Sequence, residues 1–163
     1  MIMNTIMITV NTNCINLIKS FEGLVLHPYH GAADRPEIFT IGYGTIKYPP
    51  YYLRGKMVTL TDPAITEVQA ENFLYYEVTQ KSAAVDLLLR DDLRPNQFGA
   101  LVSFAYNLGD TALKQSTLRL KVNQDPNDPM IRNEFMRWVH SNGEIVQGLV
   151  RRRKAEADLY FQL

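Results

Sequence analysis

The sequence LIKSFEGLVLHPYHGAADRPEIFTIGYGTI, residues 17–46, contains the change from helix to strand that decides the fold. Apolar side chains recur every three or four residues up to Phe21, which predicts an amphipathic helix that ends before Gly23. Residues 28–36 contain two prolines and a glycine and predict a loop. Residues 38–46 are rich in β-branched and aromatic side chains and predict a strand pair or a twisted hairpin.

The rest of the chain shows helical patterns separated by capping and turn residues. Helix starts are expected at the possible capping box of Thr66 and Gln69, at Pro95, at Ser116, at Asp128-Pro129 and near residue 149. A first helix, a small β element and then several helices predict an α+β fold with the β part segregated near the front.

We expect this fold to form one domain over residues 1–163. Residues 28–60 are expected to form a small β-containing lobe, and residues 13–27 and 61–163 a helical lobe. A cleft between two such lobes is a natural ligand site.

Composition excludes several classes of protein. Lys plus Arg (17) balance Asp plus Glu (17), and Cys14 is the only cysteine, so neither a polyanionic partner nor an internal disulfide is indicated. The three histidines lack ligands at helical spacing, and we expect no metal and no cofactor. Residues 2–10 are poorly shaped for a signal peptide, and no stretch is long enough to span a membrane.

Glu22 is the first candidate for chemistry. The negative end of the helix dipole, together with apolar Phe21 and Leu24, disfavours a charged carboxylate there, which suits a proton donor. For a lone glutamate, however, a surface side chain that points to solvent or pairs with an arginine is the commoner outcome.

Cleavage of a glycosidic bond also requires a second carboxylate. Asp34 and Glu37 lie in the loop before the predicted strands, and Thr40 offers a hydroxyl that could hold a water. We therefore expect an acid on the helix to face a carboxylate on the β side.

The run LIKSFEGLVLHPY…FTIGYGT resembles the active-site region of phage-type lysozymes, glycoside hydrolase family 24, which includes the T-even and lambdoid phage endolysins. Residues 96–123 and 134–160 resemble later blocks of the family in the right order. The resemblance implies a lysozyme-like fold, mostly helical with a small β-hairpin lobe and the active-site cleft between the lobes. It also implies an inverting endolysin muramidase that hydrolyses the β-1,4 bond between N-acetylmuramic acid and N-acetylglucosamine in bacterial peptidoglycan and lyses the host cell.

The resemblance also assigns roles to residues. Glu22 matches the catalytic acid, and Asp34 and Thr40 match the residues that position the water. A three-residue insertion is needed to align Asp34, so Glu37 stays an alternative, and Thr45 stands where relatives often have a histidine paired with the catalytic glutamate. The implied substrate contacts are Ile46, Tyr106 and Thr117; packing in the core is an equal expectation for Tyr106.

Two other functions stay open from the sequence. One is a lytic transglycosylase, which uses a single glutamate and releases anhydro-muropeptides. The other is a non-catalytic wall-binding module on a lysozyme scaffold.

The sequence also leads to expectations about the partners of the protein and its location in the cell. The basic run Arg151, Arg152, Arg153 and Lys154 is either a docking site for an anionic outer-membrane surface or, as we prefer, a solvated helix face paired in part with acids. We expect a monomer with no nucleic-acid partner. The resemblance implies that it stays in the host cytoplasm until a holin-type pore releases it to act in the periplasm.

Overall fold

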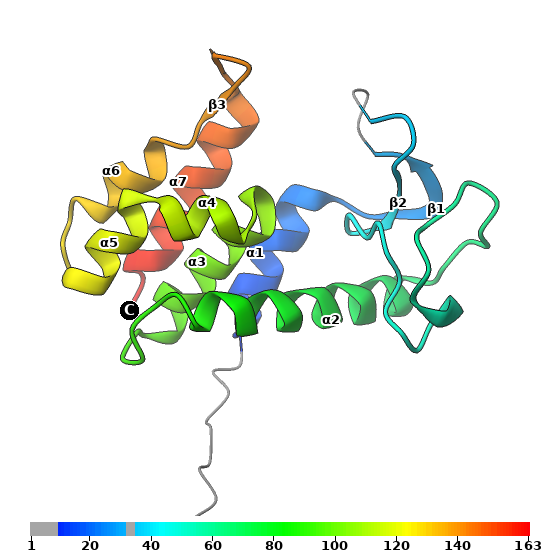
Figure 1. Cartoon of the computed structure of the whole chain (residues 1–163), viewed down its shortest axis with the longest axis horizontal. Coiled ribbons are helices and arrows are strands. Elements are labelled where there is room, and N and C mark those ends of the chain that lie inside the picture. The colour runs from blue at the N-terminus through cyan, green and yellow to red at the C-terminus, as the bar shows by residue number, and fades with distance from the viewer. Residues whose placement is uncertain (1–9, 32–34) are drawn as a thin grey trace, which may run out of the picture. The chain divides into compact units, whose positions relative to one another are not determined.

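The computed structural model describes residues 10–31 and 35–163. Its helices, shown in Figure 1, are α1 (Thr12–Glu22), η1 (Leu53–Gly55), α2 (Glu67–Asp86), α3 (Pro95–Leu108), α4 (Asp110–Gln115), α5 (Thr117–Gln124), α6 (Ile131–Met136) and α7 (Gln147–Phe161). Its strands are β1 (Val25–His30), β2 (Phe39–Gly42), β3 (His140–Ser141) and β4 (Glu144–Ile145). The predicted α+β class, mostly helical with small antiparallel strand pairs, is confirmed.

The chain divides into two compact units. One unit is Ile18–Val78, and the other contains the described residues up to Leu17 together with Thr79–Leu163. The chain passes between the units within α1 and within α2. We call them the β unit and the helical unit.

In the β unit, β1 pairs antiparallel with β2, and Tyr29 lies opposite Thr40. The register shifts between Val25 and Tyr29, and Pro28 lies in this irregular section, where a residue without an N–H group is tolerated. The prediction of a loop over residues 28–36 was therefore wrong for residues 28–30.

Residues 38–46 form only part of the predicted strand pair. Ile41 and Thr45 exchange two backbone hydrogen bonds of 2.9 Å, which fold the segment back on itself. The partner of β2, however, is β1, which precedes the loop and was not expected to be a strand.

The predicted capping box before α2 is confirmed. The backbone N–H of Thr66 donates to Gln69 Oε1 at 2.8 Å, and that of Gln69 donates to Thr66 Oγ1 at 3.1 Å. Further along α2, Phe73 is buried against the rings of Tyr48 and Tyr52. The helix thereby supplies much of the core of the β unit.

The helical unit is built around α3, whose residues from Gln97 to Ala105 are all buried and which packs against α7. The aromatic core places Phe104 against Phe135 and Trp138, with ring centroids 6.0 and 5.4 Å apart. Pro95 begins α3 as predicted. Ser116 caps α5 by accepting a hydrogen bond from the backbone N–H of Arg119, also as predicted.

Local boundaries differ from the predictions in two places. Residues after Gly109 form α4, for which no helix was expected, and α6 begins at Ile131, two residues after Pro129. The predicted turn at Asn142 and Gly143 is confirmed, because both residues have positive φ angles, 51° and 82°, and join β3 to β4 as a hairpin.

The basic run on α7 is not a solvated face throughout. Arg152 and Arg153 are buried, and Arg153 is 0% exposed, so the predictions of a solvated face and of a docking surface are wrong for these two residues. Only Arg151 and Lys154 of the run are exposed. The two buried guanidinium groups bind Glu156, also 0% exposed, with an Arg153 Nε–Glu156 Oε2 distance of 2.8 Å.

Polar groups from α3 complete this buried cluster. Ser103 donates to Glu156 Oε1 at 2.8 Å, and Arg153 donates to Asn107 Oδ1 at 2.8 Å. The Arg153 guanidinium also lies over the Phe104 ring, 5.1 Å from its centroid. The cluster therefore ties α7 to α3 in the core of the helical unit.

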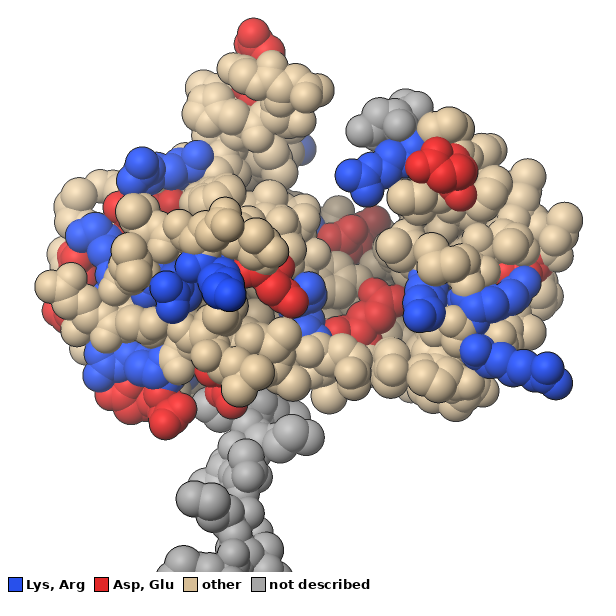
Figure 2. All heavy atoms as spheres, viewed as in Figure 1, with Lys and Arg blue, Asp and Glu red and all other residues tan. Residues whose placement is uncertain are grey.

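No helix within residues 10–31 and 35–163 is long and apolar enough to cross a membrane. On the face shown in Figure 2, basic and acidic side chains are interspersed over the helical unit. This mixture agrees with the balanced charge of the whole sequence.

Candidate active site

Glu22 is the last residue of α1, as predicted, and its side chain is half-buried. Gly23 ends the helix with a φ angle of 69°, which glycine adopts without strain, and its N–H donates to the Lys19 carbonyl at 3.2 Å. The helix end therefore fixes the backbone from which the Glu22 carboxylate extends.

The Glu22 carboxylate lies against the turn that follows β2. A Cβ atom built on Gly44 would stand 3.2 Å from Glu22 Oε2, with nothing else within 4 Å except the carboxyl carbon of Glu22. Gly44 also has a φ angle of 93°. The backbone conformation favours glycine at this position, and an added Cβ atom would press against the Glu22 carboxylate.

Thr40 is buried on β2, and its hydroxyl lies over Gly31. A Cβ atom built on Gly31 would overlap Thr40 Oγ1 at 2.0 Å. Since Gly31 follows β1 directly, the Thr40 hydroxyl lies at the start of the segment that leads to Asp34.

Tyr29 lies near two predicted site residues, although it was not itself among them. It is the pairing partner of Thr40 on β1. Burial raises the pKa of Tyr29, and the negative charge of Glu22 raises that pKa further. The sequence did contain a signal, because the family pattern has a tyrosine shortly after its Glu-Gly pair.

Of the two predicted second carboxylates, Glu37 lies within the described residues and Asp34 does not. Glu37 is exposed in a turn closed by a 3.0 Å hydrogen bond from the Ile38 N–H to the Arg35 carbonyl.

Two further predicted positions lie after the turn. Ile46 is 42% exposed, and its carbonyl accepts the Val58 N–H at 2.9 Å. Thr45, at the position where the resemblance suggests a histidine, is buried, and its hydroxyl has no hydrogen-bond partner among the residues that the structure describes.

Tyr106 and Thr117 belong to the helical unit. Tyr106 is half-buried on α3. Thr117 is the first residue of α5, and its hydroxyl donates to Glu134 and accepts from Arg137 Nη1 at 3.2 Å. The sequence had not indicated these two charged partners of Thr117.

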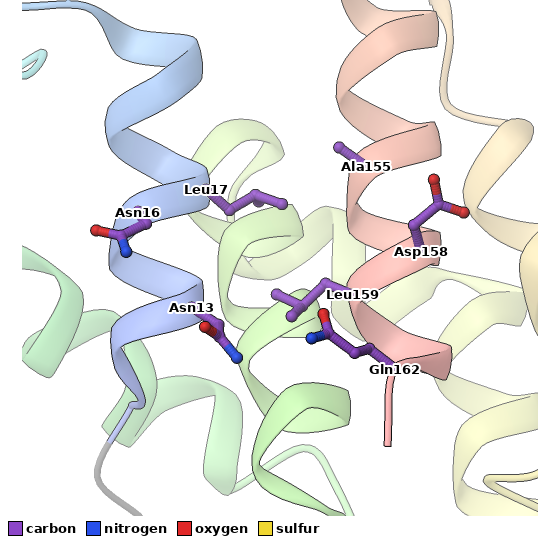
Figure 3. A pocket seen from close by; sticks show the side chains of 7 residues that line it. All are labelled: Asn13, Asn16, Leu17, Ala155, Asp158, Leu159 and Gln162. Carbon is purple, nitrogen blue, oxygen red and sulfur yellow. The ribbon is translucent and has the colours of Figure 1, made fainter.

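A pocket of about 460 Å³ in the helical unit contains none of the predicted site residues. In Figure 3, Leu17 from α1 and Leu159 from α7 point toward each other across it. It is lined by Asn13, Asn16, Leu17, Ala155, Asp158, Leu159 and Gln162.

In the part of the chain that the structure describes, no group of three or more His, Cys, Asp and Glu residues is arranged to hold a metal ion.

Comparison with known proteins shows the family to which the chain belongs. The model of the family "Phage lysozyme" matches residues 19–156. An endolysin of Bacillus phage B103 is 41% identical over 146 residues, which cover 90% of this chain and 51% of that protein. The chain thus spans about half the length of the Bacillus phage endolysins that it matches.

Solved structures give the same result at the level of the fold. An endolysin from Escherichia coli O157:H7 phage FAHEc1 is 36% identical, with a TM-score of 0.79, over 93% of this chain and 92% of that one. The muramidase domain of SpmX from Asticaccaulis excentricus is 29% identical, with a TM-score of 0.74, over 94% of this chain and 98% of that domain. The family match covers most of the chain and includes Glu22, Thr40 and Gly44, so the chain belongs to the phage lysozyme family, as its sequence predicted.

Proposed function

We propose that this chain is an endolysin muramidase that hydrolyses the β-1,4 bond between N-acetylmuramic acid and N-acetylglucosamine in peptidoglycan. The observation that carries the proposal is the placement of the Glu22 carboxylate against Gly44, inside the segment that matches the phage lysozyme family. The names of the relatives, endolysins and a muramidase domain, support the same substrate.

Glu22 is the general acid of this reaction. It donates its proton to the glycosidic oxygen as the bond between that oxygen and the anomeric carbon breaks. Gly44 has no side chain, which leaves the space beside Oε2 to the leaving oxygen. Tyr29, whose pKa is raised, stays a neutral phenol near the acid at physiological pH.

Asp34 and Thr40 position the water that attacks the anomeric carbon. Asp34 takes a proton from this water, and the Thr40 hydroxyl orients it from its place over Gly31. The product then has the opposite anomeric configuration, which requires the two carboxyl groups to lie about 6.5–9.5 Å apart. Ile46, Tyr106 and Thr117 contact the glycan strand.

The proposal includes the cellular setting that the family resemblance implies. The enzyme accumulates in the host cytoplasm, passes through a holin-type pore and cleaves the wall from the periplasm. Named relatives include SAR-endolysins of Escherichia phage Mu and of bacteriophage PS119.

Product analysis tests the reaction. Mass spectrometry of digested peptidoglycan should show new reducing ends of N-acetylmuramic acid and no excess of anhydro-muropeptides. Anhydro-muropeptides as the main product would establish a lytic transglycosylase instead. A purified protein that binds peptidoglycan but releases no product would be a wall-binding module.

The identity of the second carboxylate is tested by two substitutions. Asp34→Asn should reduce hydrolysis by about 100-fold or more, because the water loses its base, whereas Glu37→Gln should keep the wild-type rate within about two-fold. The opposite ranking would assign the base to Glu37.

A further inference from the structure

Lys19 and Glu22 lie three residues apart on α1. Their side chains contact Tyr43 and Gly44, two consecutive residues of the turn after β2. The ammonium group of Lys19 lies over the ring of Tyr43, 5.2 Å from its centroid. Glu22 Oε2 lies beside Gly44, the next residue. The end of α1 therefore touches this turn through two side chains of opposite charge.

Lys19 also reaches a third element. Its ammonium group forms an ion pair with Glu71 of α2. Hydrogen bonds with Glu71 and, to a smaller degree, with Tyr43 raise the pKa of Lys19, so the group stays cationic. Tyr43 is buried, with 5% of the residue exposed, so the ring under the cation is held in the core of the β unit.

The neighbour of Glu71 on α2 contacts the same turn. A Cβ atom built on Gly42 would stand 3.3 Å from Ala70 Cβ. Residues 42–44 therefore lie between α1 and α2 within one unit, and Lys19 contacts both Tyr43 of the turn and Glu71 of α2.

We propose that Lys19 is a positioning residue for Glu22, which holds the Tyr43–Gly44 turn at a fixed distance from the carboxylate. This inference rests on the proposed function of Glu22 as the general acid. Lys19 has no contact with substrate in this account and acts through Tyr43 and Gly44. Displacing a catalytic group by about 1 Å can cost about 100-fold in rate, so a brace of this kind affects chemistry more than stability.

A purely structural role makes a different prediction. Both partners of the ion pair are partly exposed, with 26% of the Lys19 and 38% of the Glu71 side chain accessible, and such pairs add little to stability. If the role of Lys19 is purely structural, its removal lowers Tm slightly and leaves kcat unchanged.

The test is steady-state kinetics on soluble, uncross-linked peptidoglycan strands, with new reducing ends as the readout. Lys19→Met should lower kcat by about 10-fold with KM within about two-fold, because the lost interaction acts on the transition state and not on binding. Lys19→Arg, which keeps the cation, should recover most of kcat. Lys114→Met, at an exposed lysine of α4, is the matched control and should match wild type.

A second variant keeps the test valid if Lys19→Met does not fold. Glu71→Gln removes the same ion pair from the more exposed partner, and it should lower kcat without adding to the loss in Lys19→Met. If Lys19→Met has the wild-type kcat, the proposed role of Lys19 is overturned. If Lys19→Met cannot be measured, a wild-type kcat in Glu71→Gln overturns it. An active Glu22→Gln variant would instead overturn the proposed function itself, so the two failures are distinguishable.

Discussion

Gly44 faces the carboxylate of Glu22 so closely that a methyl group on its Cα would stand 3.2 Å from Oε2. Gly44→Ala should therefore lower kcat by about 10-fold or more, because the methyl group displaces the acid and fills the space for the leaving oxygen. The positive φ angle of 93° adds strain of about 1–3 kcal/mol, which thermal unfolding should detect.

Gly143→Ala separates these two effects. Gly143 also has a positive φ angle, 82°, but nothing lies within 4 Å of an added Cβ atom. This control should lose similar stability and keep full activity per folded molecule. Equal activity in both alanine variants would show that the contact between Gly44 and Glu22 has no catalytic consequence.

Gly31 and Thr40 provide a second steric test. Gly31→Ala places a methyl group where Thr40 Oγ1 now lies, so the hydroxyl must move and hydrolysis should fall by about 10-fold or more. In a Thr40→Ala background only the Cβ atom of residue 40 stays near the added methyl group, at 3.0 Å, so Gly31→Ala should cause a much smaller further loss. Additive losses would mean that Gly31 acts independently of the Thr40 hydroxyl.

The sequence predicted elements whose signals are local. The capping box of Thr66 and Gln69, the proline that begins α3 and the Asn142-Gly143 turn depend on residues at most three positions apart. Glu22 was placed correctly at a helix end for the same reason. Its neighbour Gly44, 22 positions later, is brought beside it by contacts between distant residues, among them the pairing of β1 with β2 and the bridge between Ile41 and Thr45.

Features that depend on distant partners were missed. Residues 28–30 have the composition of a loop, but the ladder with β2 holds them in a strand that tolerates Pro28 at its irregular section. Arg152 and Arg153 belong to a run that resembles a solvated surface. Ser103 and Asn107, about 50 positions earlier, pair with the buried cluster, and no local pattern indicates that contact.

The buried cluster predicts a large loss of stability on one substitution. Glu156→Gln should lower the free energy of unfolding by about 3–5 kcal/mol, because it leaves two buried guanidinium groups without their counter-charge. Chemical denaturation measures this loss. Asp158 lies on α7 like Glu156 but forms an exposed ion pair with Arg132 of α6, so Asp158→Asn should cost less than about 1 kcal/mol. Similar small costs for both variants would contradict the role given to the cluster.

Asp62 should make stability depend on pH. Burial alone would raise its pKa, but hydrogen bonds from Lys56 and from the backbone and hydroxyl of Thr59 outweigh burial and lower the pKa. Since the folded-state pKa lies below the unfolded value of about 3.9, the stabilisation is present above that value. It is lost as the pH falls through the lower folded-state pKa.

The substitution Asp62→Asn tests this dependence. At pH 7 it should lower the free energy of unfolding by about 1–2 kcal/mol, and the difference from wild type should shrink as the pH falls below about 3.9. Asp91→Asn, at an exposed position, is the control and should show little difference at either pH. A difference for Asp62→Asn that is constant from pH 7 to pH 2 would exclude the charge of Asp62 as its cause.

The most direct test of the account is the rate at which Glu22→Gln releases reducing ends from purified peptidoglycan, beside wild type and Glu144→Gln. Glutamine keeps the shape of the side chain but cannot donate the proton, so the rate should fall by about 100-fold to 10,000-fold while Tm stays near that of wild type. Glu144, exposed in the β3–β4 hairpin, should tolerate the same change without loss. A Glu22→Gln variant that keeps the wild-type rate would contradict the assignment of Glu22 as the catalytic acid.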